Sequence, residues 1–289
     1  MKKIIYKISL ALLLGASFAS CSEDSLDPTL SNVRDTDTQP LATDVDLTML
    51  VNGMYKRMAA PEYYGRDYII FGEARTDNAF SAGYSNRFVT VSQYRINIGD
   101  AYPDDTWLQI YRIIHSANLN ATGITGDTDA ITEAKAQAYA IRALAHFDLM
   151  KLYGQMHVQD GGATALGIPY RKTSDVNTVS NVRNTIAEIR DFAYEDLDAS
   201  IATISNTSKI KLTKQAVHGL KARMALYFGT FFPADYAVAK TEAELAIAEG
   251  GAVVAEEAFI STFASGDLGA NSVFDIGVPA DDHNSSNGL

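Results

Sequence analysis

An all-α fold is predicted by three features of the 289-residue sequence. Apolar residues recur at steps of three and four positions over six segments, which is the period of an amphipathic helix. Several of these segments end at glycine, a residue that commonly follows the last turn of a helix. Stretches in which apolar and polar residues alternate, as they do in half-buried strands, are few and short. The predicted helical domain occupies residues 44–289.

The first predicted helix begins at Asp44 and is stopped by Pro61. Its apolar stripe consists of Leu47, Leu50, Val51, Met54, Tyr55 and Met58. Five further helices are predicted at about residues 105–120, 132–153, 184–204, 213–228 and 234–249. Gly154 and Gly229 follow two of them directly, as expected for helix ends.

Two segments alternate enough to be predicted as short strands, residues 87–98 and 272–278. Two of the helices carry alanines at turn-spaced positions: Ala134, Ala138 and Ala145, then Ala216, Ala222 and Ala225. Small residues let neighbouring helix backbones approach closely, a packing typical of helical repeats. Because no strict 34-residue period is visible, we predict an irregular TPR-like helical-repeat superhelix with long aromatic-rich loops and few short strands.

A lipoprotein signal peptide is predicted at residues 1–20. Lysines precede an apolar stretch at residues 8–19, which is too short for a bilayer core that takes about 20 helical residues. Cys21, the only cysteine, follows small residues as in a bacterial lipobox, although Phe18 replaces the usual leucine-like residue. We expect Cys21 to be lipidated; the alternative is an incidental free thiol. Residues 21–43 are polar and aperiodic and are expected to form a flexible tether.

The chain is acidic, with 24 Lys and Arg against 35 Asp and Glu and a formal charge of −11. An acidic protein repels polyphosphate, so no nucleic-acid partner is expected. The histidines form no zinc-binding motif, and neither a phosphate-binding glycine loop nor a nucleophile elbow occurs. Adjacent carboxylates such as Asp104 and Asp105 point apart on regular elements and make weak acid–base pairs. We therefore predict that the protein is not an enzyme and uses no cofactor or metal.

Aromatic residues are concentrated between residues 55 and 111, where twelve occur, roughly twice the chain average of 10%. Polar side chains are interleaved with them. Aromatic faces stack on sugar rings or peptide side chains, while amide, carboxylate and guanidinium groups bond hydroxyls and carbonyls. The alternative is that most of these rings are core residues that anchor a long connection. The predicted ligand-binding residues are Tyr63, Arg75, Asp77, Asn78, Tyr84, Asn86, Tyr94 and Tyr102.

Several segments, taken in order, resemble those of a known family. They are the lipobox at Cys21, then residues 73–78 (EARTDN), 107–118 (WLQIYRIIHSAN), 138–154 (AYAIRALAHFDLMKLYG), 167–170 (GIPY) and 211–227 (KLTKQAVHGLKARMALY). Each segment alone is a modest signal, but their order over about residues 47–278 is specific. In this the chain resembles the SusD/RagB family, the surface nutrient-binding lipoproteins of Bacteroidetes.

The resemblance implies a TPR-containing protein that binds a ligand, usually a glycan and in some members a peptide, without cleaving it. It implies a SusC-like TonB-dependent transporter as partner, with the lipoprotein as its lid. The protein would then be lipid-anchored at the surface of the outer membrane. Because family members continue beyond the segment at residues 272–276, we expect this chain to be incomplete at its C-terminus. A protein-binding helical-repeat scaffold and an unrecognised hydrolase remain alternative functions.

Overall fold

The computed structural model describes residues 43–84, 86–155, 161–175, 177–178, 180–250, 254–264 and 272–276. The chain divides into two units, Met1–Leu41 and Ala42–Leu289, and every described residue belongs to the second. The predicted signal peptide, Cys21 and nearly all of the predicted tether lie outside the described residues. No described helix is both long enough and apolar enough to cross a membrane.

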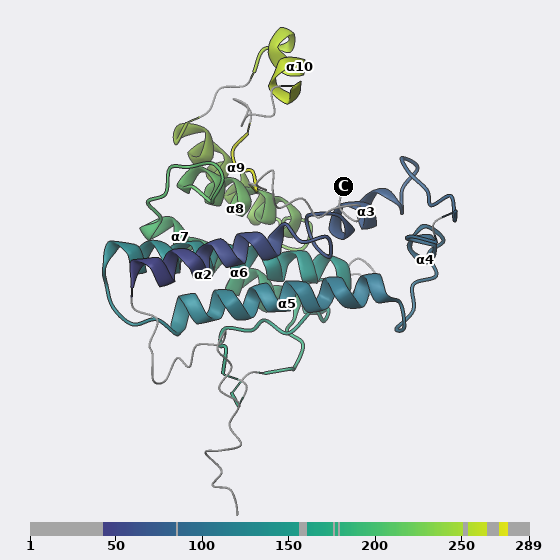
Figure 1. The fold of residues 1–289 in the computed structure, drawn as a ribbon, viewed down its shortest axis with the longest axis horizontal. Helices are drawn as coiled ribbons and strands as arrows, with labels where there is room; N and C mark the ends of the chain where they lie inside the picture. The colour runs from purple at the N-terminus through teal and green to yellow at the C-terminus, as the bar shows by residue number, and fades with distance from the viewer. Residues whose placement is uncertain are drawn as a thin grey trace, which may run out of the picture. The chain divides into compact units, whose positions relative to one another are not determined.

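Six long helices confirm the six predicted from the apolar period (Figure 1). They are α2 (Asp44–Met58), α5 (Ala101–Thr122), α6 (Asp129–Tyr153), α7 (Ile186–Thr203), α8 (Lys214–Phe228) and α9 (Asp235–Ala248). Shorter helices are α3 (Asp67–Glu73), α4 (Val89–Ser92), α10 (Glu256–Ala264) and the 3-10 turn η2 (Gly162–Thr164). The all-α prediction is therefore confirmed.

Threonine side chains begin four of the long helices. The hydroxyls of Thr43, Thr128, Thr185 and Thr213 each accept from a backbone N–H in the first turn of α2, α6, α7 and α8. At Thr185 the cap is reciprocal, because the Glu188 carboxylate also accepts from the Thr185 N–H at 2.8 Å. These caps satisfy N–H groups that have no partner inside the helix, and they fix where each helix starts.

Helix α6 is the centre of the core. It packs against α5 on one side and α7 on another, while α2 contacts both α5 and α6. Residues 140–150 of α6 are all buried, so this stretch has no solvent-facing side. Its alanines let neighbouring helices approach closely, which accounts for a helix that is apolar on nearly every side. Further along the chain, α8 packs against α7 and most extensively against α9.

The two predicted strands are not found among the described residues. The segment 87–98 instead contains the one-turn helix α4, entered through Phe88 in the left-handed conformation with φ 54°. Residues 272–276 have no regular secondary structure; the Asp275 N–H donates to Lys209 O at 2.9 Å. An isolated antiparallel bridge joins Leu166 to Thr185. Alternation alone did not predict a strand correctly here, because within the described part of the chain neither segment meets a partner strand that would satisfy its backbone.

Candidate ligand-binding site

The segment between α3 and α5 is anchored by a small apolar cluster of its own. Phe71, Ala74, Phe88 and Val91 are its buried members, and Ile70, Tyr102 and Leu152 pack against them. The Phe88 and Tyr102 rings stack at 4.2 Å, and the Arg66 guanidinium lies 5.6 Å from both ring centroids. This cluster packs the middle of the segment against the start of α5 and the end of α6. The neighbouring residues of the segment are therefore held in place, although most of them are exposed to solvent.

Three aromatic rings of this segment face solvent. Phe80 is 81% exposed, Tyr84 101% and Tyr94 72%. The Tyr94 hydroxyl donates to the Arg75 carbonyl, which ties its ring to the end of α3. Asn86, Phe88 and Tyr94 all have left-handed backbones, with φ between 54° and 55°. Non-glycine residues in this conformation cost about 1–2 kcal/mol each, so the surrounding contacts must impose this backbone path.

The polar residues predicted for the site divide into two groups. Asp77, Asn78 and Asn86 are exposed beside the solvent-facing rings. The Asn78 amide reaches the Glu73 carboxylate at 3.3 Å. Arg75 is half-buried and its Nε donates to the Phe71 carbonyl at 2.7 Å, so its guanidinium also caps the end of α3.

Two predicted ligand residues belong to the packed interior. Tyr63 is fully buried and its hydroxyl donates to Asp148 Oδ2 at 2.7 Å. Tyr102 is half-buried in its stack with Phe88. Tyr63 therefore has no exposed surface to offer a ligand, whereas Tyr102 keeps part of its surface exposed.

Asp148, a buried carboxylate of α6, gathers three tyrosines from the segment after α2. Tyr63, Tyr64 and Tyr68 all donate their hydroxyls to it, at 2.5–2.7 Å, and Lys151 lies 2.9 Å from Oδ1. Burial, followed by the negative charge of Asp148, raises the pKa of all three tyrosines. They therefore remain protonated donors, as a buried carboxylate requires.

A pocket of about 360 Å³ lies beside this cluster. Its walls come from the α2–α3 connection, from α3, α6 and α8, and from residues 272–276; the lining residues are Ala59, Tyr64, Gly65, Ile69, Leu144, Leu220, Arg223, Phe274, Asp275 and Ile276. Its size is at the lower end for small-molecule sites. The exposed rings Phe80, Tyr84 and Tyr94 do not line it, so the structure presents two separate candidate surfaces.

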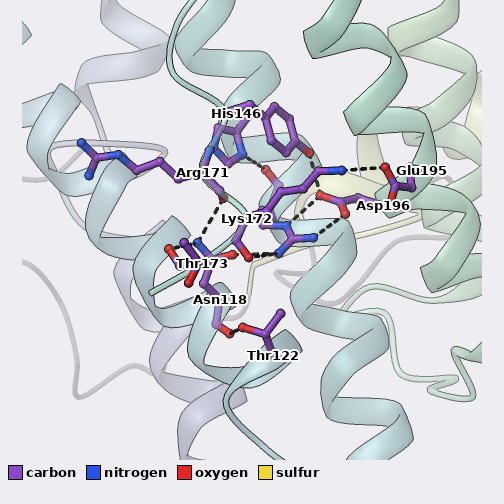
Figure 2. Close-up of polar contacts among 10 residues, drawn as sticks. Asn118, Thr122, His146, Arg171, Lys172, Thr173, Glu195 and Asp196 are labelled. Atoms are coloured by element: carbon purple, nitrogen blue, oxygen red, sulfur yellow. Dashed lines mark hydrogen bonds and ion pairs between the residues drawn. The ribbon is translucent and has the colours of Figure 1, made fainter. Parts of the chain in front are cut away.

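A second buried polar network holds the loop at residues 167–173 against three helices. Arg142 of α6 donates to both oxygens of Asp196, from Nε at 2.8 Å and Nη2 at 2.5 Å. Its Nη1 reaches Asn118 Oδ1 at 2.7 Å, and the Tyr170 hydroxyl donates to Asp196 at 2.6 Å. Asn118 in turn donates to the carbonyls of Arg171 and Thr173, both at 3.1 Å (Figure 2).

His146 completes this network in a single tautomer. Its Nδ1 lies 2.8 Å from the Arg142 carbonyl, and its Nε2 lies 3.0 Å from the Arg171 N–H. A carbonyl can only accept and an N–H can only donate, so Nδ1 carries the proton and Nε2 accepts. Burial lowers the pKa of His146 well below its ordinary value. The imidazole is a neutral structural bridge, and its ring stacks on Tyr170 at 3.7 Å.

Sequence reasoning missed both buried networks and the exposed Phe80. Asp148 and Arg142 stand among the apolar residues of the buried stretch 140–150, and a buried charge needs a partner. The tyrosines that bind Asp148 lie 80–85 positions away, and the carboxylate that binds Arg142 lies 54 positions away, so spacing could not identify them. Among the described residues, no three His, Cys, Asp or Glu side chains are grouped to hold a metal ion.

Comparison with known proteins identifies the family. A family model described as "Starch-binding associating with outer membrane" matches residues 30–226. The chain is 30% identical over 119 residues to SusD-like protein P2 of Formosa agariphila, covering 39% of this chain and 24% of that protein. It is 24% identical over 235 residues to a SusD-like protein of Bacteroides ovatus, covering 78% and 39%. A solved SusD superfamily protein of Bacteroides thetaiotaomicron superposes with a TM-score of 0.74 at 23% identity, covering 86% of this chain and 55% of that one.

The chain spans less than half the length of these two curated relatives and about half of the solved structure. The match to the family model nevertheless covers more than half of this chain. It includes four of the five segments on which the resemblance rests beyond Cys21, and nearly all of the fifth. The chain therefore belongs to the SusD-like family.

Proposed function

We propose that this protein captures glycans at the cell surface and delivers them, without cleaving a bond, to a SusC-like TonB-dependent transporter in the outer membrane. Glycan binding is proposed because Phe80, Tyr84 and Tyr94 are exposed on a single segment, and this segment is anchored by the apolar cluster around Phe71 and Phe88. Membership of a family described as starch-binding supports the choice of glycan over peptide.

Exposed aromatic rings offer a surface on which a glycan can stack. Large contiguous apolar patches on a protein surface commonly mark binding sites, and three exposed aromatic rings on one short segment could together contribute to such a patch. Sugar rings offer an apolar face for stacking and a rim of hydroxyls for hydrogen bonds. Asp77, Asn78 and Asn86, all exposed on the same segment, supply acceptors and donors for such a rim.

Binding is tested by isothermal titration with soluble starch oligosaccharides and a panel of other neutral glycans. Replacing one exposed ring, Tyr84→Ala, is expected to weaken binding about 2- to 10-fold, the effect of losing one aromatic contact. Tyr236→Ala is the matched control, because Tyr236 is an exposed ring on α9, far along the chain from this segment. Equal affinity of the Tyr84 variant and the wild type for every bound glycan would reject this surface as the site.

Delivery to a transporter requires the protein to be anchored to the outer membrane, which we propose occurs through lipid on Cys21. Native mass spectrometry of the detergent-solubilised protein from its own outer membrane measures the acyl mass and any bound transporter together. We expect an acylated chain in complex with a large β-barrel protein, and loss of the acyl mass in Cys21→Ala. An acylated protein that carries no such partner would contradict the role as a transporter lid.

A further inference from the structure

The pocket beside the Asp148 cluster has apolar walls that come from separate parts of the chain. Leu144 of α6 and Leu220 of α8 line it and are buried, and Ile69 of α3 also lines it. Phe274 and Ile276 contribute further apolar lining. A ligand with an apolar portion would remove this surface from water, which favours binding by about 25 cal/mol for each Å² buried.

The wall at residues 272–276 is held in place at two points. The Phe274 ring meets Tyr55 of α2 edge-on at 6.0 Å, and Tyr55 is itself buried. The Asp275 N–H donates to the Lys209 carbonyl at 2.9 Å. Because its backbone is fixed next to the α7–α8 connection, Asp275 has a defined place on the pocket wall.

The pocket carries one positive and one negative side chain. Arg223 of α8 and Asp275 both line it and both are exposed. Among the described residues neither forms an ion pair, with the other or with any further group. The nearby Asp148 does not serve Arg223, because Lys151 and three tyrosine hydroxyls already surround it.

The Tyr64 hydroxyl is not available to a ligand in the pocket. It already donates to Asp148 at 2.5 Å, so Tyr64 lines the pocket with its aromatic ring only. Most of the lining side chains are thus apolar, and the groups that could bind a charged ligand are the guanidinium of Arg223 and the carboxylate of Asp275.

We propose that this pocket binds a free α-amino acid with an apolar side chain. Arg223 receives the α-carboxylate, Asp275 receives the α-ammonium group, and the side chain lies between Leu144, Leu220 and Phe274. A zwitterion can pair with both charges at once. A simple anion would be repelled by the Asp275 carboxylate, and a simple cation would be repelled by the Arg223 guanidinium. This site is separate from the exposed rings proposed to bind glycans, and it does not depend on that function.

The experiment is titration of the chain with L-leucine and L-phenylalanine, followed by calorimetry and by protein NMR. N-acetyl-L-leucine lacks the ammonium charge and L-leucinamide lacks the carboxylate, so each tests one half of the recognition. Arg223→Gln and Asp275→Asn are compared with Lys240→Gln, which removes an exposed charge from α9 outside the pocket. All three changes are at exposed side chains, and circular dichroism checks that each variant is folded.

Saturable binding of leucine is expected, weakened about tenfold or more by Arg223→Gln, by Asp275→Asn and by either blocked ligand. Lys240→Gln should bind as the wild type does. Three results would overturn the proposal: no saturable binding of either amino acid, equal binding by all three variants, or binding of N-acetyl-L-leucine as tight as that of leucine. Glycan titration of the same samples is a separate readout, so loss of one activity is distinguishable from loss of the other.

Discussion

Removing the Asp196 carboxylate leaves the Arg142 guanidinium buried without its partner. The two side chains are 3% and 4% exposed and are joined by two hydrogen bonds, of 2.8 and 2.5 Å. Breaking a buried ion pair on one side costs about 3–5 kcal/mol, a large part of the 5–15 kcal/mol that typically holds a domain folded. Asp196→Ala is therefore expected to lower the free energy of unfolding by that amount.

An exposed carboxylate next to Asp196 on the same helix provides the matched control. Glu195, the neighbour of Asp196, pairs with Lys172 at 2.6 Å, but their side chains are 68% and 36% exposed (Figure 2). An exposed pair contributes about 0–1 kcal/mol, so Glu195→Gln should be nearly neutral. The two substitutions remove adjacent carboxylates of one helix and differ mainly in burial.

Urea unfolding followed by circular dichroism measures both variants against the wild type. A second arm replaces both members of the buried pair by apolar residues, Arg142→Met with Asp196→Leu, and should recover part of the loss because no charge remains unpaired. The reasoning fails if Asp196→Ala is no more destabilising than Glu195→Gln.

Three further predictions concern single residues. Gly65→Ala should lower the free energy of unfolding by about 1–3 kcal/mol in the same urea assay, because its new Cβ would lie 2.3 Å from the Ala59 carbonyl oxygen; unchanged stability would contradict this. Burial raises the pKa of Glu242, but hydrogen bonds from His218 and Lys221 outweigh it and hold that pKa below its ordinary value. Stability from these contacts is therefore present above the ordinary carboxyl pKa and lost as pH falls through the lowered one, and Glu242→Gln should flatten the acid limb of a pH–stability curve. His146 should show a neutral Nδ1–H imidazole by ¹⁵N NMR from pH 7 down through its ordinary pKa of about 6.5; a titration there would refute the lowered pKa, and a proton on Nε2 would refute the assigned tautomer.

Three of the segments that carried the family resemblance contribute residues to internal packing. Asn118, Arg142, His146 and Tyr170 come from three of those segments and meet in one buried network. Their role is to hold the loop at residues 167–173 against α5, α6 and α7. For these four residues the motif identifies the fold, because their polar groups are used inside the protein.

The exposed rings show where sequence reasoning was limited. Tyr63 and Tyr84 both stand in irregular segments rich in aromatic residues, yet Tyr63 is fully buried and Tyr84 fully exposed. The difference is set by Asp148, 85 positions from Tyr63, which binds its hydroxyl. No local pattern encodes a partner at that distance.

The sequence by itself determined the six long helices, because the 3.6-residue period, the threonine caps and the terminal glycines are local properties of the chain. Only the tertiary structure decided that residues 87–98 form α4 and a loop with left-handed residues, because a strand needs a partner that this segment does not meet. It also brought Arg223 and Asp275, 52 positions apart, to the walls of one pocket. Helix formation depends on neighbours three and four residues away, whereas burial and sites depend on contacts between distant segments.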